Sequence, residues 1–397
     1  MGDFDTGNVI YRADKDILIK INPHNINEEG AFNINKAARH IILIVNLFDL
    51  EKKFPEKLSE AIYDYYSSGA RDEITLRRNI SIFNNYEILP KLLRNVSSVN
   101  TSTSILGLKI GNPIMAAPLA MQSMAHADGE IATAKAMSSL DSIMTLPTSS
   151  NKSIEEVAPH SDKLFFQLYF AKDRKITEDI LKRCYEKNYK AIVFTADAPR
   201  LGTREKDERN SFKMPENLTL ANFKGTSFEK YDDYEGSSMS MHSDHLFDPT
   251  LTFEIIHWIK EKSKLPVLVK GILRPDDAAK CFENGADGII ISNHGGRQLD
   301  TAVPTLKQIR PIREEVGKDK LLIADGGIRR GTDILKCLAL GANAVQIGRP
   351  ILWGLAHDGQ DGVELVLNIL LRELVETMIL TGCTNLNDIS QDLITEI

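Results

Sequence analysis

The stretch Gly288-Ile-Ile-Ile-Ser-Asn-His-Gly-Gly-Arg-Gln-Leu-Asp300 joins an apolar run to a polar loop. The apolar run at its start lacks strict alternation, which is typical of a parallel strand buried on both faces. His294 and Arg297 follow the run three positions apart, so a base that titrates near neutral pH lies beside a fixed fork of cationic donors. Such a pair suits removal of a proton from a substrate that carries a carboxylate. The stretch therefore predicts a buried strand with a candidate catalytic loop at its end.

The same kind of short apolar run recurs along the chain, with helical segments between the runs. The expected strands are 113–118, 142–146, 164–169, 191–197, 266–270, 288–292, 320–325 and 344–348. The expected helices between them include 129–140, 177–187, 275–283, 305–316 and 332–340. Strands that alternate with helices over about 250 residues predict an α/β fold, a (β/α)8 TIM barrel. The alternative is an open doubly wound sheet, which usually carries Gly-x-Gly-x-x-Gly after its first strand, and the chain has none there.

Two parts of the chain depart from this alternation. Residues 1–44 are polar and without a clear period, so we expect an N-terminal extension with little packed structure ahead of a barrel domain at 45–390. A helical pattern over 47–66 predicts a helix that leads into the barrel. The connection after the fourth strand, 205–248, is long and polar. A connection of this length is either a lid or a disordered insert, and both alternatives stay open.

Composition and charge exclude several classes of function. The 397 residues carry a formal net charge of −7, which gives no electrostatic basis for binding nucleic acid. No apolar run reaches membrane-spanning length, and the N-terminus lacks the basic and apolar regions of a signal peptide. The four cysteines form no Cys-x-x-Cys pair, and the chain does not end in a Ser-Lys-Leu type of signal. We therefore expect a soluble intracellular protein, cytoplasmic or peroxisomal, without a cysteine metal site.

Polar side chains collect where the expected strands end, which is where the active sites of such barrels lie. Glycines and arginines after the seventh and eighth strands match the usual barrel cradle for a single phosphate; they are Gly327, Arg329, Gly348 and Arg349. Lys270, one strand before His294, could place positive charge against a ring system that gains electrons. Together these features predict FMN bound flat over the strand ends, with His294 above it.

With these features, the sequence resembles the FMN-dependent α-hydroxy acid oxidase and dehydrogenase family, nearest to the glycolate oxidase-type 2-hydroxy acid oxidases. The segment Ser292-Asn-His-Gly-Gly-Arg-Gln298 is the family signature, and the likeness extends over about residues 47–387. The other segments that support it are 63–70, 121–126, 165–169, 199–202 and 268–271.

The resemblance implies oxidation of (S)-2-hydroxy acids, such as glycolate, lactate or longer acids, to 2-oxo acids. FMN would be the cofactor and O2 the acceptor, with H2O2 as product, and His294 would take either the α-proton or the hydroxyl proton. The implied catalytic residues are Tyr65, Tyr169, Asp197, His294 and Arg297. The implied substrate-binding residues are Tyr65, Tyr169, Arg204, His294 and Arg297. The implied FMN-binding residues are Ala120, Gln167, Thr195, Lys270, Ser292, Asp325, Gly327, Arg329, Gly348 and Arg349. The family is typically tetrameric, so a homotetramer is expected.

Two other functions remain open at this point. One is an L-lactate-type dehydrogenase that passes electrons to a quinone or a cytochrome, and the other is a non-catalytic flavin-binding protein. The loop after the second strand departs from the glycolate oxidase pattern, since Pro147 replaces a flavin-contacting Ser and Ser149 replaces a Trp of the pocket wall. Leu119 stands where Thr is common. The loss of the Trp predicts a larger pocket for the substrate side chain, so that lactate and longer acids are used at least as well as glycolate.

Overall fold

The computed structural model describes residues 9–13, 17–21, 44–226, 228–229 and 245–397. The chain divides into two compact units, Met1–Val45 and Asn46–Ile397. In the first unit, strands β1 (Val9–Ala13) and β2 (Ile17–Ile21) pair antiparallel. The remainder of the predicted extension over 1–44 lies outside the described residues, apart from Ile44 itself. All the predicted site residues belong to the second unit.

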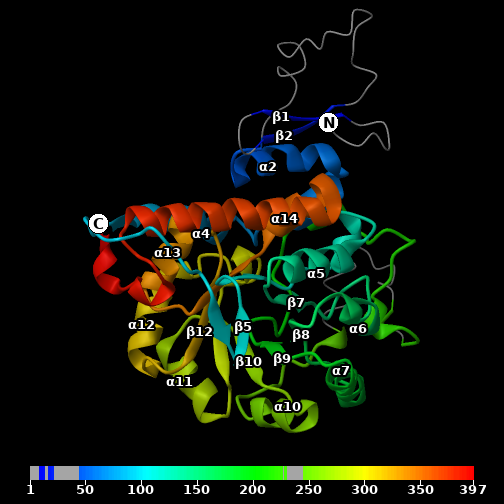
Figure 1. Cartoon of the computed structure of the whole chain (residues 1–397). Coiled ribbons are helices and arrows are strands. Elements are labelled where there is room, and N and C mark those ends of the chain that lie inside the picture. The colour runs from blue at the N-terminus through cyan, green and yellow to red at the C-terminus, as the bar shows by residue number, and fades with distance from the viewer. Residues whose placement is uncertain (1–8, 14–16, 22–43, 227, 230–244) are drawn as a thin grey trace, which may run out of the picture. The chain divides into compact units, whose positions relative to one another are not determined.

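Eight parallel strands close into a barrel in the second unit (Figure 1). In chain order they are β6 (Ile114–Ala116), β7 (Met144–Leu146), β8 (Leu164–Leu168), β9 (Ala191–Thr195), β10 (Val267–Ile272), β11 (Gly288–Ile291), β12 (Leu321–Asp325) and β13 (Ala344–Ile347). Pairing of β13 with β6 closes the barrel, with Val345 opposite Ile114. The predicted (β/α)8 barrel is therefore confirmed, and every predicted strand overlaps an observed one.

Helices lie outside the barrel. Those between its strands are α5 (Gly129–Ser139), α6 (Ile154–Val157), α7 (Arg174–Glu186), α10 (Ile255–Ser263), α11 (Pro275–Glu283), α12 (Leu306–Val316) and α13 (Gly331–Ala339), and α14 (Arg349–Leu380) follows the last strand. The five predicted helices are all present, and α11 has the predicted bounds because Pro275 at its first turn suits a helix start. Helix α14 is interrupted at Asp358 and Gly359, and it packs against α5 and α13.

Smaller elements complete the second unit. Helix α4 (Ile74–Ser81) contacts the turn that carries His294. Strand β3 (Tyr86–Ile88) pairs antiparallel with β14 (Ile394–Glu396). Strands β4 (Thr103–Ile105) and β5 (Leu108–Ile110) form a hairpin that precedes the first barrel strand.

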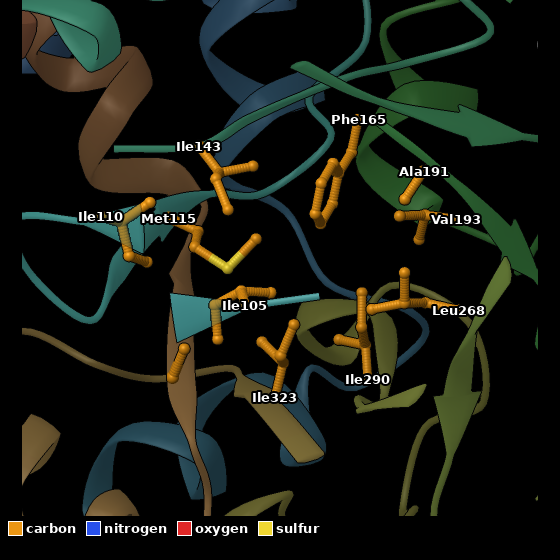
Figure 2. Close-up of a cluster of buried hydrophobic side chains, with 11 residues drawn as sticks. Ile105, Ile110, Met115, Ile143, Phe165, Ala191, Val193, Leu268, Ile290 and Ile323 are labelled. Carbon is orange, nitrogen blue, oxygen red and sulfur yellow. The ribbon is translucent and has the colours of Figure 1, made fainter. Parts of the chain in front are cut away.

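Apolar side chains from most of the barrel strands form a buried cluster (Figure 2). Its members are Ile105, Ile110, Met115, Ile143, Phe165, Ala191, Val193, Leu268, Ile290, Ile323 and Ala344. The first two come from the β4–β5 hairpin, so the hairpin and the barrel share one core. Close packing of this kind resists changes of volume, and it gives the strand ends a rigid support.

The prediction of a single helix over 47–66 is wrong. The chain instead forms α2 (Leu47–Lys53), the 3₁₀ turn η2 (Phe54–Lys57) and α3 (Glu60–Ser67). Pro55 lies in η2, and proline interrupts a helix because it lacks an amide hydrogen and its ring clashes with the preceding turn. The break lets α3 take its own direction, and α3 carries Tyr65.

The connection after β9 is long, as predicted, but its first part has a defined structure. It contains α8 (Glu205–Arg209) and the 3₁₀ turn η6 (Ala221–Phe223), and the side chains of Phe212 and Phe223 are buried. Residues 205–226 therefore pack as part of the unit. The two alternatives, a lid and a disordered insert, now concern residues 227 and 230–244, which lie outside the described residues.

Within the described part of the chain, no helix combines the length and the apolar character needed to cross a membrane. All four cysteines are buried, and none forms a disulfide.

Candidate active site

A pocket opens at the C-terminal ends of the barrel strands and brings together nearly all the predicted site residues. Those that line it are Tyr65, Ala120, Gln167, Tyr169, Thr195, Arg204, Lys270, His294, Arg297, Asp325, Gly327, Arg329, Gly348 and Arg349. The other two lie just behind the lining, where Asp197 contacts His294 and Ser292 accepts a hydrogen bond from Lys270. The pocket contains about 1300 Å³ of empty space, part of it open to solvent. Ligand sites commonly measure roughly 300–1,000 Å³, so a mononucleotide and a small substrate fit together.

The turn after β11 places His294 over this pocket. His294 has a φ of 60°, in the left-handed region that side chains other than glycine rarely adopt, and Gly295 and Gly296 follow with φ of 63° and 76°. A Cβ on Gly296 would lie 2.6 Å from the backbone nitrogen of Leu76, so only glycine fits there. The Ser292 hydroxyl accepts a hydrogen bond from the His294 amide at 3.0 Å. Glycine and serine thus hold a strained histidine in one orientation.

The two ring nitrogens of His294 face different partners. Nδ1 lies 3.0 Å from Oδ1 of Asp197, whereas Nε2 lies 3.4 Å from the Tyr169 hydroxyl. A carboxylate can only accept a hydrogen bond, so Nδ1 carries the proton in the neutral ring. The lone pair is then on Nε2, which is the basic atom on the pocket side.

The protonation states of this pair favour a base. Burial lowers the pKa of His294 below its ordinary value, although the charge and the hydrogen bond of Asp197 act in the opposite direction. Burial alone would raise the pKa of the Asp197 carboxyl, but the charge and hydrogen bond of His294, together with Lys270, hold it below its ordinary value. At neutral pH the imidazole is therefore neutral and the carboxylate charged. When the imidazole accepts a proton, the adjacent carboxylate stabilises the cation.

Two arginines lie close to the ring of Tyr65, and of these Arg204 is buried and Arg297 half-buried. The guanidinium carbons of Arg297 and Arg204 are 5.2 and 5.9 Å from the centre of the Tyr65 ring. Arg297 donates to the carbonyl of Ser68 at 2.9 Å, and Arg204 lies 3.5 Å from a carboxylate oxygen of Asp207. Burial, followed by the charge of Arg204, lowers the pKa of Arg297 to about 10. Two cations so close together, one of them buried, favour an anionic ligand, and the guanidinium fork matches a carboxylate.

Two tyrosines supply neutral donors beside these arginines. Burial raises the pKa of the Tyr65 and Tyr169 phenols, so both hydroxyls keep their protons at neutral pH. Tyr65 stacks on Phe212 at 4.5 Å between ring centres, and Tyr169 packs on Phe247 at 4.6 Å. The aromatic contacts hold the two hydroxyls in place, where they can donate hydrogen bonds to a bound molecule.

The strand ends next to His294 have the groups that an FMN ring system needs. The Lys270 ammonium lies 2.8 Å from the Ser292 hydroxyl and 3.2 Å from Oδ2 of Asp325. Gln167 donates from Nε2 to the Thr195 hydroxyl at 3.0 Å. Among the described residues, Oδ1 of Asp325 has no hydrogen-bond partner although it is buried. A buried acceptor of this kind fits the donors of a flavin ring or of its ribityl chain.

The phosphate end of an FMN site is provided by Arg329 and nearby glycines. Arg329 is 5% exposed, stacks over Trp353 at 4.7 Å and donates from Nη1 to the carbonyl of Ile328 at 3.0 Å. Its Nε atom has no hydrogen-bond partner within the described part of the chain. A buried guanidinium with a spare donor favours an anionic ligand, so these residues fit a phosphate group.

Arg349 shows a geometry that the sequence did not predict. Its Nε, Nη1 and Nη2 atoms donate to the carbonyls of Tyr66, Gly295 and Ser68 at 3.1, 3.1 and 2.9 Å. It therefore ties the end of α3 to the turn that carries His294. Its contact with a phosphate stays a prediction.

Several pocket residues were not predicted, among them Leu201, Phe247 and Leu352. Leu201 lies inside the segment 199–202 that supports the family resemblance, so this segment could have indicated Leu201 as a pocket residue. No local sequence pattern indicates Phe247 as a pocket residue, because it reaches the pocket through a backbone bridge with Ala171. The three departures from the glycolate oxidase pattern all line the pocket; they are Leu119, Pro147 and Ser149.

A family model described as FMN-dependent dehydrogenase matches residues 55–396. The chain belongs to this family. Family membership makes FMN the cofactor, in agreement with the spare donors and acceptors at the strand ends.

Similar proteins from the family carry oxidase names. A 2-hydroxyacid oxidase of Dictyostelium discoideum is 44% identical over 94% of this chain and 95% of its own length. An L-lactate oxidase of Nostoc sp. (strain PCC 7120 / SAG 25.82 / UTEX 2576) is 46% identical over 87% of this chain and 96% of its own. A crystal structure of mandelate oxidase with (S)-4-hydroxymandelic acid superposes with a TM-score of 0.85, at 37% identity, over 88% of this chain and 98% of that chain.

Proposed function

We propose that this protein oxidises (S)-2-hydroxy acids to 2-oxo acids and transfers the electrons to O2. The observation that carries the proposal is His294, whose Nδ1 is held by Asp197 while Nε2 faces the pocket that Arg204 and Arg297 also line. A base opposite a carboxylate-binding pair is what abstraction of a proton from a 2-hydroxy acid requires. The relatives named as oxidases support O2 as the acceptor over a quinone or a cytochrome.

The pocket residues have separate roles in this reaction. Arg204 and Arg297 bind the carboxylate of the substrate, and the hydroxyls of Tyr65 and Tyr169 donate hydrogen bonds to its oxygen atoms. Nε2 of His294 takes the proton that leaves the substrate, and Asp197 stabilises the imidazolium that results. These interactions fix the reacting carbon over the strand ends.

Bound FMN supplies a two-electron acceptor at the strand ends. We propose that it is held by the predicted set, with Arg329, Gly327 and Gly348 at its phosphate and Lys270 and Gln167 at its ring. The balance is complete, because the hydroxy acid loses two electrons and two protons and O2 gains them to form H2O2.

The part of the pocket that receives the substrate side chain decides which acid is used. Ser149 lines the pocket where the glycolate oxidase pattern has a large aromatic wall, and Pro147, which replaces a flavin-contacting serine, stiffens the same loop. Each substrate methylene that the larger pocket buries contributes about 0.8 kcal/mol, so lactate and longer acids gain over glycolate.

The finer organisation follows from the same resemblance. We propose a homotetramer. Light scattering of the purified protein tests this, since the mass that it measures can be compared with the 44.3 kDa of one chain. We also propose a cytoplasmic or peroxisomal location, since all four cysteines are free thiols.

Product stoichiometry tests the function. The holoprotein supplied with (S)-lactate and O2 should form one 2-oxo acid and one H2O2 for each O2 consumed, and (R)-lactate should give neither product. Oxidation that requires an added quinone or cytochrome would favour the dehydrogenase alternative. No flavin reduction by any 2-hydroxy acid would favour the non-catalytic alternative.

A further inference from the structure

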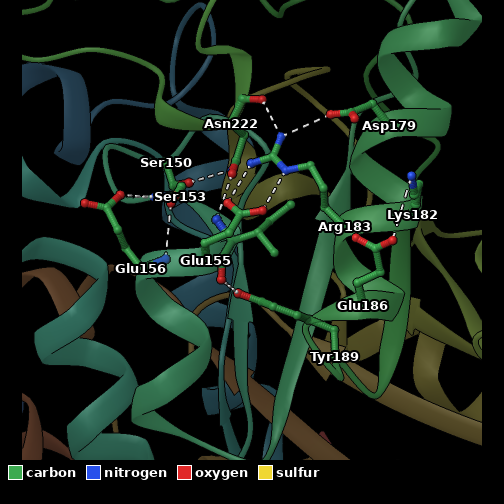
Figure 3. Close-up of polar contacts among 11 residues, drawn as sticks. Ser150, Ser153, Glu155, Glu156, Asp179, Lys182, Arg183, Glu186, Tyr189 and Asn222 are labelled. Carbon is green, nitrogen blue, oxygen red and sulfur yellow. Dashed lines mark hydrogen bonds and ion pairs between the residues drawn. The ribbon is translucent and has the colours of Figure 1, made fainter.

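Asn222 lies in η6, in the long connection after β9, and its side chain is 4% exposed. Its Nδ2 atom donates to the Ser150 hydroxyl at 2.8 Å and to the carbonyls of Thr148 and Pro147 at 3.2 and 3.5 Å. Its Oδ1 atom accepts from the amide of Ile154, at the start of α6, at 3.0 Å. Both ends of one amide group thus bind the segment that follows β7 (Figure 3).

The segment 147–150 is held on its pocket side as well. The amide and the hydroxyl of Thr148 both donate to Gln167, at 3.1 and 2.6 Å, and its hydroxyl accepts from the amide of Tyr169 at 2.9 Å. The Ser149 carbonyl accepts from the amide of Met121 at 2.9 Å. The pocket-side contacts and Asn222 therefore hold the segment between them. Pro147 and Ser149, which lie in the pocket wall, are fixed between these two sets of contacts.

Arg183 on α7 holds Asn222 in turn. Its Nη1 atom donates to the backbone carbonyl of Asn222 at 3.0 Å, and its Nε and Nη2 atoms donate to the two carboxylate oxygens of Glu155 at 2.8 and 2.9 Å (Figure 3). The hydrogen bonds from Arg183 lower the pKa of Glu155 to about 2, so this ion pair is intact throughout the neutral range. Arg183 thus anchors the long connection to α6 and α7 at Asn222, the residue whose side-chain amide contacts the segment 147–150 from this connection.

The nature of the wall makes this anchoring important. In the glycolate oxidase pattern a tryptophan fills the space at Ser149, whereas here a small side chain leaves the shape of the wall to the backbone. A backbone wall keeps its position only if its carbonyl groups have fixed partners, and Asn222 supplies them for Thr148 and Pro147.

We infer that Asn222 is a positioning residue that fixes the 147–150 segment and thereby sets the selectivity of the pocket for the substrate side chain. The inference rests on the proposed function, and it concerns only the side-chain end of the substrate. Glycolate has no side chain to contact this wall, whereas 2-hydroxyoctanoate packs against it. Loss of the Asn222 amide should therefore affect the long substrate and leave the short one nearly unchanged.

The variant Asn222→Asp tests this inference because it keeps the shape and replaces the donor with a carboxylate oxygen that faces two carbonyls. We expect KM for 2-hydroxyoctanoate to rise about fivefold or more, from the loss of hydrogen bonds that each contribute a factor of a few. The kcat/KM for glycolate should stay within about twofold. The matched control is Asn284→Asp at the end of α11, where the amide bonds the carbonyl of Lys280 at 2.9 Å, far from the pocket lining. The control should leave both substrates unchanged.

A second variant and a second measurement cover the case in which Asn222→Asp fails to fold. Arg183→Lys keeps the charge but loses the fork, so it should raise KM for 2-hydroxyoctanoate in the same direction by a smaller factor. Hydrogen exchange of the amides at 148–150 should become faster in either variant, and this readout does not depend on turnover. Equal loss of activity towards both substrates, or no change in either, would overturn the inference. If wild type uses no 2-hydroxy acid while exchange still rises in the variants, the proposed function fails and the contact between Asn222 and the segment is upheld.

Discussion

Replacing Asp197 with asparagine removes the charge that faces Nδ1 of His294 and keeps the shape of the side chain. The two contacting atoms are 3.0 Å apart, and the side chains of His294 and Asp197 are only 20% and 15% exposed. A hydrogen bond to a charged partner contributes about 1.5–3 kcal/mol, which corresponds to roughly 10- to 150-fold in rate. We therefore expect kcat/KM for (S)-lactate to fall by about 10- to 150-fold in Asp197→Asn. FMN should remain bound, because Asp197 does not line the pocket.

The pH profile separates this effect from a general loss of structure. Asp197 raises the pKa of His294 and so partly offsets burial, which lowers it. The base form of His294 exists above that pKa, so kcat/KM of the wild type should fall as the pH drops through it. In Asp197→Asn the raising contribution is gone, so the acid limb should move to lower pH.

The assay is initial-rate kinetics across the acid range, with FMN content measured in parallel. The matched control is Asp276→Asn, which removes an exposed carboxylate that pairs with Arg274 at 2.9 Å on the outside of the barrel. An unchanged kcat/KM, or an acid limb that moves to higher pH, would refute the role given to Asp197.

Three further substitutions test carboxylate binding, the pocket for the substrate side chain and FMN binding. Arg297→Lys should raise KM and lower kcat for every substrate, because an ammonium group cannot form the guanidinium fork; normal kinetics would remove Arg297 from carboxylate binding. Ser149→Trp should shift preference towards glycolate by a few fold for each substrate carbon, measured as kcat/KM across glycolate, lactate, 2-hydroxybutyrate and 2-hydroxyoctanoate. If wild type already shows a steep fall with chain length, another residue occupies the space beside Ser149. Arg329→Met should weaken FMN binding by roughly 10- to 150-fold in titrations of the apoprotein, and unchanged affinity would exclude Arg329 from the phosphate site.

The barrel could be predicted because each strand is a short apolar run, and most of these runs end at a polar residue. Strands with both faces buried give this signal locally, and the closed barrel then brings their carboxyl ends together. His294, Lys270 and Asp325 could therefore be assigned to one pocket although they come from three separate strands. The family signature at 292–298 added the partners that come from outside the strands.

Other features could not be predicted because they depend on contacts between distant segments. Phe247 reaches the pocket through a bridge to Ala171, and no periodic pattern marks it. Arg349 donates to three carbonyls of the α3 and β11 turns, which no rule on phosphate cradles implies. Asn222 contacts a segment more than seventy positions away, and a single asparagine in a polar connection gives no sign of such a role.

The helix over 47–66 was wrong for a different reason. The apolar spacing continues across Pro55, but the proline interrupts the helix there. Periodicity reports which face is buried, whereas proline decides whether the backbone can continue as a helix.

The role of His294 as the base is tested most directly by anaerobic rapid mixing of wild type and His294→Ala with (S)-lactate. Wild-type flavin absorbance should bleach within the first turnover and recover when O2 is added. His294→Ala should keep its FMN and bleach about 10²- to 10⁴-fold more slowly, because a positioned base contributes a factor of that size. Bleaching of both proteins at the same rate would contradict the assignment of His294 as the base.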